Sequence, residues 1–169
     1  MRLFIGISPS DDVRRALAGM QAFLLRYGIS GTYLAPENLH MTLAFIGEYP
    51  EADMVLDAMG KVAFDPFRII YDRIGTFRKS IVWGGTEPSQ PLENLAKKLR
   101  YELDRADIPF DHAEFVPHFT LARHAGFGCG LPPVEIAPVP MTVSRMILFR
   151  SDRGENGMVY TPIGAADAC

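Results

Sequence analysis

The sequence predicts an α+β fold built on antiparallel strands. Segments with the two-residue apolar alternation of a strand alternate along the chain with segments that have the 3.6-residue period of a helix. Several strand-to-strand connections are too short for the helical crossover that parallel neighbours need. The chain also lacks a Gly-rich dinucleotide loop and a Walker phosphate loop. These observations favour an antiparallel sandwich over a doubly wound parallel sheet.

Composition indicates one soluble domain. The chain has 169 residues, of which 48% are hydrophobic and 22% charged, so it can bury a sizeable core. A net charge of −3 disfavours a broad surface for gripping duplex DNA. No apolar run approaches the ~20 residues of a membrane span, and Met1–Ser10 lacks the features of a secretory signal. We therefore expect a cytoplasmic protein. Cys129 and Cys169 have no metal or redox spacing, and we expect no disulfide.

The first elements follow from their apolar spacing. Arg2–Ser8 reads as a strand, and Pro9 suits the first position of a helix with Ser8 as its cap and Asp11 in its first turn. Gly28 is the expected end of this helix. Its buried face is predicted from steps of three and four residues: Val13, Leu17, Met20, Leu24 and Tyr27.

The next segments are mainly strands. Thr32–Leu34 is a candidate short strand, and Leu39–Ile46 is a strand by its alternation. A second helix begins at Pro50, with an inward face formed by Met54, Val55, Ala58, Met59 and Val62. Phe67–Phe77 and Ser80–Gly84 read as two strands.

A third helix is predicted over Pro88–Arg105. Its inward face consists of Leu92, Leu95, Ala96, Leu99 and Leu103. Ile108–Glu114 follows as a loop and Pro117–Arg123 as a strand. Gly126–Pro140 is rich in Gly and Pro, so we expect a loop with at most a short edge strand at Val134–Ile136.

The remaining segments suggest a hairpin. Thr142–Ser151 reads as a strand, Arg153–Gly157 as a turn, and Met158–Ile163 as the returning strand. Gly164–Cys169 is expected to be a loose tail.

The most informative feature is a repeated strand. Residues 40–44 read His-Met-Thr-Leu-Ala and residues 118–122 read His-Phe-Thr-Leu-Ala, in a chain with only four histidines. Because side chains alternate between the faces of a strand, the histidine, threonine and alanine of each copy share one face. The apolar residues between them face the core. A duplicated core strand would need only these apolar positions, so the polar face indicates a function.

Two imidazoles and two hydroxyls suit chemistry at phosphorus. With unperturbed pKa values near 6.5, one of His40 and His118 can take a proton from a nucleophile while the other gives a proton to a leaving oxygen. The hydroxyls of Thr42 and Thr120 can donate hydrogen bonds to nonbridging phosphate oxygens. This reaction needs no metal. The strand pattern does not say which histidine is the acid.

The paired strands resemble the two-histidine (2H) phosphoesterase superfamily. Within it, the chain is similar to bacterial and archaeal RNA 2′,3′-cyclic phosphodiesterases, historically called 2′-5′ RNA ligases. The similarity spans nearly the whole chain and is carried by the following segments: Arg2–Ile5, Glu37–Gly47, Val82–Gly85, Pro117–Arg123, Leu148–Ser151 and Tyr160–Thr161.

The resemblance implies a fold. It implies a bilobal, pseudo-symmetric sandwich of two antiparallel sheets with outer helices and a central cleft. Residues 1–169 would form one domain of two intertwined lobes, with one His-x-Thr strand in each.

The resemblance also implies an activity. It implies metal-independent hydrolysis of RNA 2′,3′-cyclic phosphate ends to 2′-phosphomonoesters. His40 would be the general acid and His118 the general base. Thr42, Thr120 and Arg123 would bind the phosphate. No metal or cofactor is implied. The expected partners are RNA 3′ ends or small nucleotides with a cyclic phosphate, and a monomer is expected.

Three residues have two interpretations each. On an ideal strand Arg123 faces away from His118, so it reaches the cleft only if the strand ends or bulges there. The alternative for Arg123 is a surface ion pair. Phe4 and Tyr33 could stack on a base, although a core phenylalanine and a surface tyrosine are the commoner roles. The acidic segment that contains Asp111 and Glu114 disfavours tight binding of long RNA.

Three alternative functions remain open. A metal site could use His112, His118, His124 and Cys129, but no single strand or helix brings that spacing to within ~2 Å of one ion. A noncatalytic RNA- or nucleotide-binding module is possible, although both His-x-Thr motifs are intact. The same chemistry could act on small cyclic nucleotides, ADP-ribose cyclic phosphate or 2′-5′ linked oligonucleotides. Ligation would be the reverse reaction.

Overall fold

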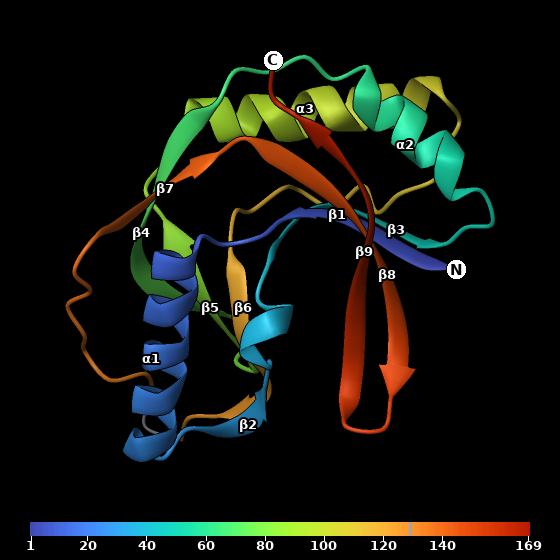
Figure 1. Ribbon diagram of the computed structural model, residues 1–169. Helices are drawn as coiled ribbons and strands as arrows, with labels where there is room; N and C mark the ends of the chain where they lie inside the picture. Colours follow the sequence, from blue (N-terminus) through green and yellow to red (C-terminus); the bar gives the residue numbers. More distant parts are fainter. Residues whose placement is uncertain (129) are drawn as a thin grey trace.

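Every strand of the molecule joins one curled antiparallel sheet (Figure 1). The computed structural model describes residues 1–128 and 130–169. Within these residues the strand order is β7-β4-β5-β6-β3-β1-β8-β9, and β2 pairs with β6 outside this path. The predicted α+β class with antiparallel strands is confirmed. Cys129 lies outside the described residues.

The sheet has two lobes joined at one point. The first lobe contains β1 (Arg2–Ile7), β3 (Met41–Glu48), β8 (Arg145–Gly154) and β9 (Gly157–Asp167). The second contains β2 (Ser30–Tyr33), β4 (Phe67–Phe77), β5 (Ile81–Thr86), β6 (Phe119–Gly126) and β7 (Val139–Val143). The only pairing between β3 and β6 is Met41 with Phe119. The two predicted antiparallel sheets are therefore continuous through one residue pair.

The helices cross between the lobes. Helix α1 (Asp11–Tyr27) follows β1 in the chain but packs on β6 and β7 of the second lobe. Helix α3 (Gln90–Arg105) follows β5 but packs on β3 of the first lobe and on α2 (Ala52–Gly60). Figure 1 shows α1 beside β4 and β5, with α2 and α3 together at the opposite end of the molecule. Part of the core of each lobe is thus covered by a helix that follows a strand of the other lobe in the chain.

The predicted helix face agrees fully with the observed burial in α3 and only in part in α1 and α2, where Met54 is 39% exposed. All five residues of the predicted inward face of α3 are buried. In α1, Val13, Leu17 and Leu24 are buried, whereas Tyr27 is 55% exposed. Gln21 is buried in α1, and its amide donates to the carbonyls of Leu34 and Leu121. Because both acceptors belong to the second lobe, this polar residue fastens α1 there.

The start of α1 differs from the prediction. Its cap is Ser10, not Ser8: the Oγ of Ser10 accepts a hydrogen bond of 3.2 Å from the amide of Val13. Pro9 lies before the helix rather than in its first turn. A serine on either side of Pro9 fits the pattern, and the side chain that reaches the free amides of the first turn is the one at position 10. Gly28 ends the helix as predicted, with φ of 103°.

The C-terminal part contains three differences. No strand forms at Val134–Ile136, and the predicted strand Thr142–Ser151 is divided at Ser144 between β7 and β8. The expected tail Gly164–Cys169 is mostly ordered strand, because β9 pairs with β8 as far as Asp167 opposite Arg145. Pairing along the whole length of β8 supplies backbone hydrogen bonds that the short segment of mainly small residues does not reveal.

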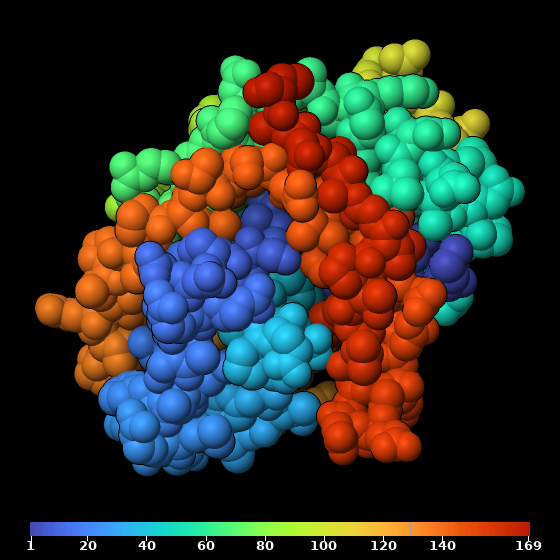
Figure 2. Space-filling view, viewed as in Figure 1, coloured from blue at the N-terminus to red at the C-terminus, as the bar shows by residue number. Residues whose placement is uncertain are grey.

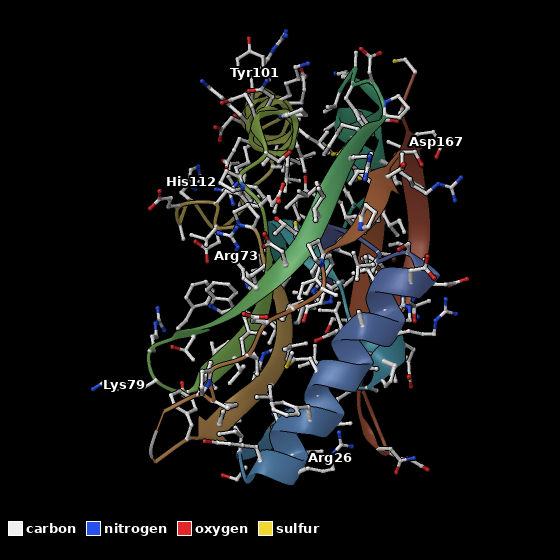
Figure 3. The ribbon with its side chains drawn as sticks, turned by 90° about the vertical axis from the view of Figure 1, so that its left-hand side faces the viewer. Arg26, Arg73, Lys79, Tyr101, His112 and Asp167 are labelled. Atoms are coloured by element: carbon white, nitrogen blue, oxygen red, sulfur yellow. The ribbon has the colours of Figure 1, made fainter. Side chains whose placement is uncertain are left out.

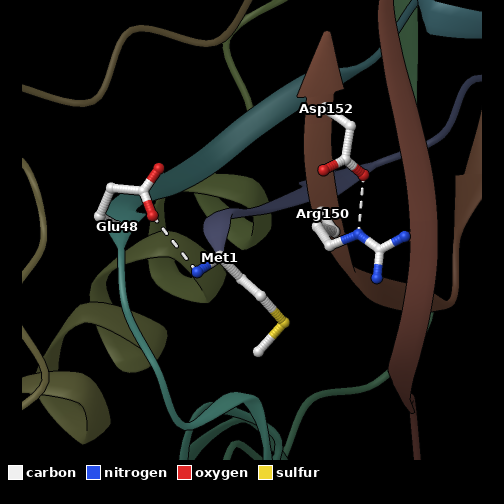
Figure 4. Close-up of polar contacts among 4 residues, drawn as sticks. All are labelled: Met1, Glu48, Arg150 and Asp152. Atoms are coloured by element: carbon white, nitrogen blue, oxygen red, sulfur yellow. Dashed lines mark hydrogen bonds and ion pairs between the residues drawn. The ribbon is translucent and has the colours of Figure 1, made fainter. Parts of the chain in front are cut away.

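Ion pairs at the edges of the first lobe are on the surface. The amino group of Met1 lies 3.3 Å from Glu48, and the Nε of Arg150 lies 2.7 Å from Asp152 (Figure 4). Such exposed pairs contribute about 0–1 kcal/mol each. The fold therefore depends on the buried apolar core that spans both lobes. None of the helices in the described residues is long and apolar enough to cross a membrane.

Candidate active site

The junction between the lobes places the four polar residues of the repeat on one face. Met41 and Phe119 are directly opposite each other in antiparallel strands, and both side chains are fully buried. Because neighbours in sequence point to opposite faces, the residues before and after each of them point away from this core. His40, Thr42, His118 and Thr120 therefore share the other face, related by a two-fold axis through the Met41–Phe119 pair.

His40 is held by hydrogen bonds at both ring nitrogens. Its Nδ1 lies 2.7 Å from the carbonyl oxygen of Asn38, and its Nε2 lies 3.0 Å from Oγ1 of Thr42. A carbonyl oxygen only accepts, so Nδ1 carries the proton. In the neutral ring, Nε2 then accepts from the Thr42 hydroxyl. The nitrogen available for proton transfer is Nε2.

His118 is anchored in the same way. Its Nδ1 donates over 2.6 Å to the carbonyl of Val116, which is again two residues earlier in the chain. Each histidine immediately precedes its strand, since β3 begins at Met41 and β6 at Phe119. This irregular backbone lets the carbonyl turn towards the ring. Both imidazoles are thus fixed in the tautomer that leaves Nε2 as the reactive nitrogen.

The pKa values of both histidines are lowered, which favours the neutral imidazoles. The pKa of His40 is lowered to about 4, mainly because burial disfavours the imidazolium; the carbonyl of Asn38 opposes this shift, and the charges of Arg123 and His118 add to it. Burial also lowers the pKa of His118, against the effect of the Val116 carbonyl and together with the charge of Arg123. Arg123 therefore lies within electrostatic reach of both rings.

Aromatic side chains surround His40. The ring of Phe4 is 4.6 Å from the imidazole, and Tyr160 meets it edge-on at 5.2 Å. Phe149 lies 5.0 Å from the ring of Phe4 and 6.2 Å from the imidazole. Gly6 allows this close packing, because a Cβ there would be 2.7 Å from the carbonyl oxygen of Met41. Strand β1 therefore approaches the start of β3 closely enough to support the histidine.

His118 has one aromatic neighbour from the second lobe. Phe77, at the end of β4, meets its ring edge-on at a centroid distance of 4.9 Å. Phe77 in turn packs against Trp83 of β5 at 5.2 Å. The two histidines therefore have similar backbone anchors but unequal surroundings, and His40 is the more enclosed of the two.

Arg123 reaches the cleft. A pocket of about 290 Å³ is lined by Arg2, Phe4, His40, Thr42, Phe45, Arg123, Ser151, Met158 and Tyr160. The register between β6 and β5 shifts by one residue at Leu121. Arg123 needs such a β-bulge to reach the cleft, because on an ideal strand its side chain would face away from His118. His118 and Thr120 are not among the lining residues and lie on the other side of the junction.

A larger hollow opens beside this pocket. It measures about 520 Å³ and is bounded by Thr32–Asn38 on one side and by the tip of the β8–β9 hairpin on the other, with Arg123 and Tyr160 shared with the first pocket. Figure 2 shows this hollow between the light blue segment and the orange-red hairpin. Tyr33 lines it, whereas Phe4 lines the smaller pocket while its ring is buried against His40.

The alternative metal site is not assembled in the described residues. Within residues 1–128 and 130–169, no three His, Cys, Asp or Glu side chains are grouped so that they could hold an ion. His112, labelled in Figure 3, lies in the loop after α3, where its Nε2 is 3.4 Å from Asp104 and its ring stacks on Phe110. His118 lies instead at the start of β6, with its Nδ1 bound to the carbonyl of Val116 and its ring against Phe77. The fourth candidate ligand, Cys129, is outside the described residues.

Three residues of the site are not among the predicted site residues. Phe77 reads as an ordinary strand residue, Tyr160 reaches His40 from a distant segment, and Asn38 meets His40 through its backbone carbonyl, two residues earlier in the chain. An asparagine in a turn, such as Asn38, usually bonds to the backbone of its own turn. Only the tertiary structure shows that the rings of Phe77 and Tyr160 and the backbone carbonyl of Asn38 contact the histidines.

Comparisons with known proteins agree with this geometry. The family model described as the 2'-5' RNA ligase superfamily matches residues 9–155. The chain is similar to the RNA 2',3'-cyclic phosphodiesterase of Escherichia coli (strain K12), with 30% identity over 96% of this chain and 93% of that protein. It is also 30% identical to the RNA 2',3'-cyclic phosphodiesterase of Thermus thermophilus, over 95% of this chain and 87% of that protein.

A solved structure shares the fold. The crystal structure of E. coli LigT complexed with 3'-AMP superimposes with a TM-score of 0.83 at 28% identity. The match covers 99% of this chain and 96% of that chain. The arrangement of the two lobes is therefore shared along the full length of both proteins.

Proposed function

The chain belongs to the 2'-5' RNA ligase superfamily, and on that premise we propose that it hydrolyses 2′,3′-cyclic phosphate ends of RNA to 2′-phosphomonoesters. The observation that carries the proposal is the pair of imidazoles on one face of the sheet, each anchored through Nδ1 to a carbonyl two residues earlier. Relatives named RNA 2',3'-cyclic phosphodiesterase, matched over nearly the whole chain, support the substrate class.

In the proposed reaction, the histidines transfer two protons. His118 takes a proton from water, whose oxygen forms a bond to phosphorus. His40, protonated at Nε2, gives its proton to the 3′ oxygen as the bond between phosphorus and that oxygen breaks. The product is a 2′-phosphate with a free 3′ hydroxyl. The choice of acid and base follows the resemblance, because the two anchored rings are alike.

The remaining residues of the site bind the phosphate. Thr42 and Thr120 flank the histidines with hydroxyl donors, and Arg123 supplies a positive charge that acts on both rings. A phosphodiester anion in this position raises the pKa of both imidazoles, because it stabilises the charged form that burial disfavours. Substrate binding thereby supplies the protonated His40 that the free protein lacks at pH 7. The proposed mechanism uses no metal, and one chain supplies all five groups, so the reaction needs no residue from a second copy.

The neighbouring hollow favours short substrates as a second candidate. Glu37 and Glu155 line it together with one positive residue, Arg123. A run of phosphates along this surface would be repelled, whereas a single nucleoside fits. Small cyclic nucleotides or 2′-5′ linked oligonucleotides would use the same histidines and the same proton transfers.

The direct test is hydrolysis of a short RNA ending in a 2′,3′-cyclic phosphate, with EDTA present. We expect turnover to the 2′-phosphate, and a fall in kcat of roughly 100-fold or more in His40→Ala and in His118→Ala. His112→Ala is the matched control, because it removes a histidine outside the cleft and should retain full activity.

Two outcomes would contradict the proposal. Full activity in either cleft variant would show that paired acid–base catalysis is wrong. A folded wild-type protein that binds the RNA without turnover would indicate a noncatalytic binding module.

A further inference from the structure

Asn38 makes hydrogen bonds in two directions from one position. It is the last residue of the short 3-10 helix Pro36–Asn38, just before β3. Its carbonyl oxygen accepts from Nδ1 of His40 at 2.7 Å. Its side-chain Nδ2 donates to the carbonyl of Met158 in β9 at 2.8 Å, across 120 residues of sequence. One residue therefore connects a cleft histidine to the β8–β9 hairpin.

The side-chain bond fixes a segment that has little rigidity of its own. A 3-10 turn of three residues has poor hydrogen-bond geometry and no further turns to support it. A rotation of the peptide after Asn38 would carry the carbonyl oxygen away from Nδ1 of His40. The bond to Met158 opposes that rotation, because it ties the residue to a strand that pairs along its whole length with β8.

The hairpin acts on His40 through a second contact. Tyr160 is two residues after Met158, so the two side chains lie on the same face of β9. The ring of Tyr160 meets the imidazole edge-on at 5.2 Å, and both residues line the 290 Å³ pocket. Strand β9 therefore supports the ring of His40 directly and its Nδ1 acceptor through Asn38.

Within the residues that the structure describes, the acceptor of His118 has no such side-chain connection. The equivalent acceptor for His118 is Val116, whose apolar side chain is 41% exposed and forms no hydrogen bond. The pseudo-two-fold axis thus relates the two carbonyl–Nδ1 hydrogen bonds, but it does not relate the side-chain bond from Asn38 to Met158. That side-chain bond supports His40 and has no counterpart at His118 among the described residues.

We propose that Asn38 is a positioning residue, which holds the Nδ1–H tautomer and the orientation of His40 by fastening its own carbonyl to the β8–β9 hairpin. The proposal deepens the proposed function and rests on it for the role of His40. The hairpin also forms one wall of the larger hollow, which Asn38 lines as well. A nucleoside bound there contacts the same residues that orient the histidine.

The test combines imidazole spectroscopy with kinetics. In Asn38→Ala the carbonyl remains but the tether is lost, so ¹⁵N chemical shifts of the His40 ring should move from a single Nδ1–H tautomer to a mixture. His118 is the internal control, and its ring should keep its wild-type shifts. A misplaced acid lowers the rate of reaction more than binding, so kcat should fall by about 10- to 100-fold with KM changed less than about 3-fold.

A second variant tests whether the loss of any side-chain hydrogen bond to a backbone carbonyl changes the His40 spectrum and kcat. Lys98→Ala also removes a side-chain donor to a backbone carbonyl, that of Ala63 at 3.2 Å, on α3 away from the cleft. It should leave kcat and both ring spectra unchanged. Wild-type His40 shifts in Asn38→Ala, or equal changes in both rings, would overturn the proposal. The ring spectra need no substrate, so they decide on Asn38 even if the cyclic phosphate proves to be the wrong substrate.

Discussion

The two threonines of the site differ in what their hydroxyls do before substrate binds. Thr42 donates to Nε2 of His40 at 3.0 Å, whereas Thr120 is 9% exposed and forms no side-chain bond to its histidine within the described residues. A phosphate that enters the cleft must take the Thr42 hydroxyl away from Nε2. The hydroxyl thus occupies Nε2 of His40 until an anion replaces it.

Replacement by valine keeps the shape of each threonine and removes the donor. In Thr42→Val and in Thr120→Val we expect transition-state stabilisation to fall by about 1–3 kcal/mol, measured as kcat/KM on the cyclic-phosphate RNA. Thr142→Val, on an exposed position of β7, is the matched control and should keep the wild-type value. An unchanged kcat/KM in both cleft variants would mean that the hydroxyls do not touch the phosphate.

The lowered histidine pKa values make a prediction about pH. In the proposed mechanism the free protein reacts with one proton shared by the histidine pair, a state that exists only between the two apparent pKa values of the pair. Since the pKa values of both His40 and His118 lie below the usual 6.5, the singly protonated pair becomes scarcer as pH rises above that value. We expect a bell-shaped kcat/KM with its maximum below pH 6.5 and a decline from pH 6.5 to 8. An optimum above pH 7 would contradict this.

At the scale of single elements, strand β1 controls the position of β3. Gly6 pairs with Thr42, and a Cβ at Gly6 would lie 2.7 Å from the Met41 carbonyl oxygen, a backbone atom that cannot move alone. Gly6→Ala should therefore lower the free energy of unfolding by about 1–3 kcal/mol and also lower kcat, because β3 carries the site.

Gly19→Ala is the matched control for this substitution. Gly19 lies on the exposed side of α1 with no atom within 4 Å of the added Cβ, so alanine there should stabilise by up to about 1 kcal/mol. Both variants can be measured by urea unfolding. Equal stability changes at the two positions would show that the contact between β1 and β3 is not tight.

The spacing of apolar residues predicted those elements whose structure depends on neighbouring residues in the chain. The apolar face of α3 could be predicted in full, because its spacing alone determines which side packs. The His-x-Thr strands gave the four residues of the junction face. The end of β9 could not be predicted, because Gly164–Asp167 is ordered by pairing with β8 rather than by its own composition. The aromatic neighbours of the histidines also depend on contacts between distant segments.

At the scale of the whole molecule, the exchange of helices makes the lobes depend on each other. Helix α1 covers β6 and β7, and α3 covers β3, so neither lobe keeps its core when the other unfolds. We expect one cooperative transition, with the calorimetric and van't Hoff enthalpies equal. Histidine ring signals from the two lobes should be lost at the same temperature. Two separate transitions would show that the lobes are independent.

The order of the strands along the chain has a consequence for synthesis on the ribosome. Strand β1 emerges first, but its neighbour β8 and the acceptor of the Asn38 amide emerge last, 120 residues after Asn38 in the case of Met158. Until then β1 has an unpaired edge, and His40 lacks both Tyr160 and a fixed carbonyl. A nascent chain therefore holds all four residues of the repeat long before it can arrange them. The surroundings of His40 are therefore complete only once translation has passed β9.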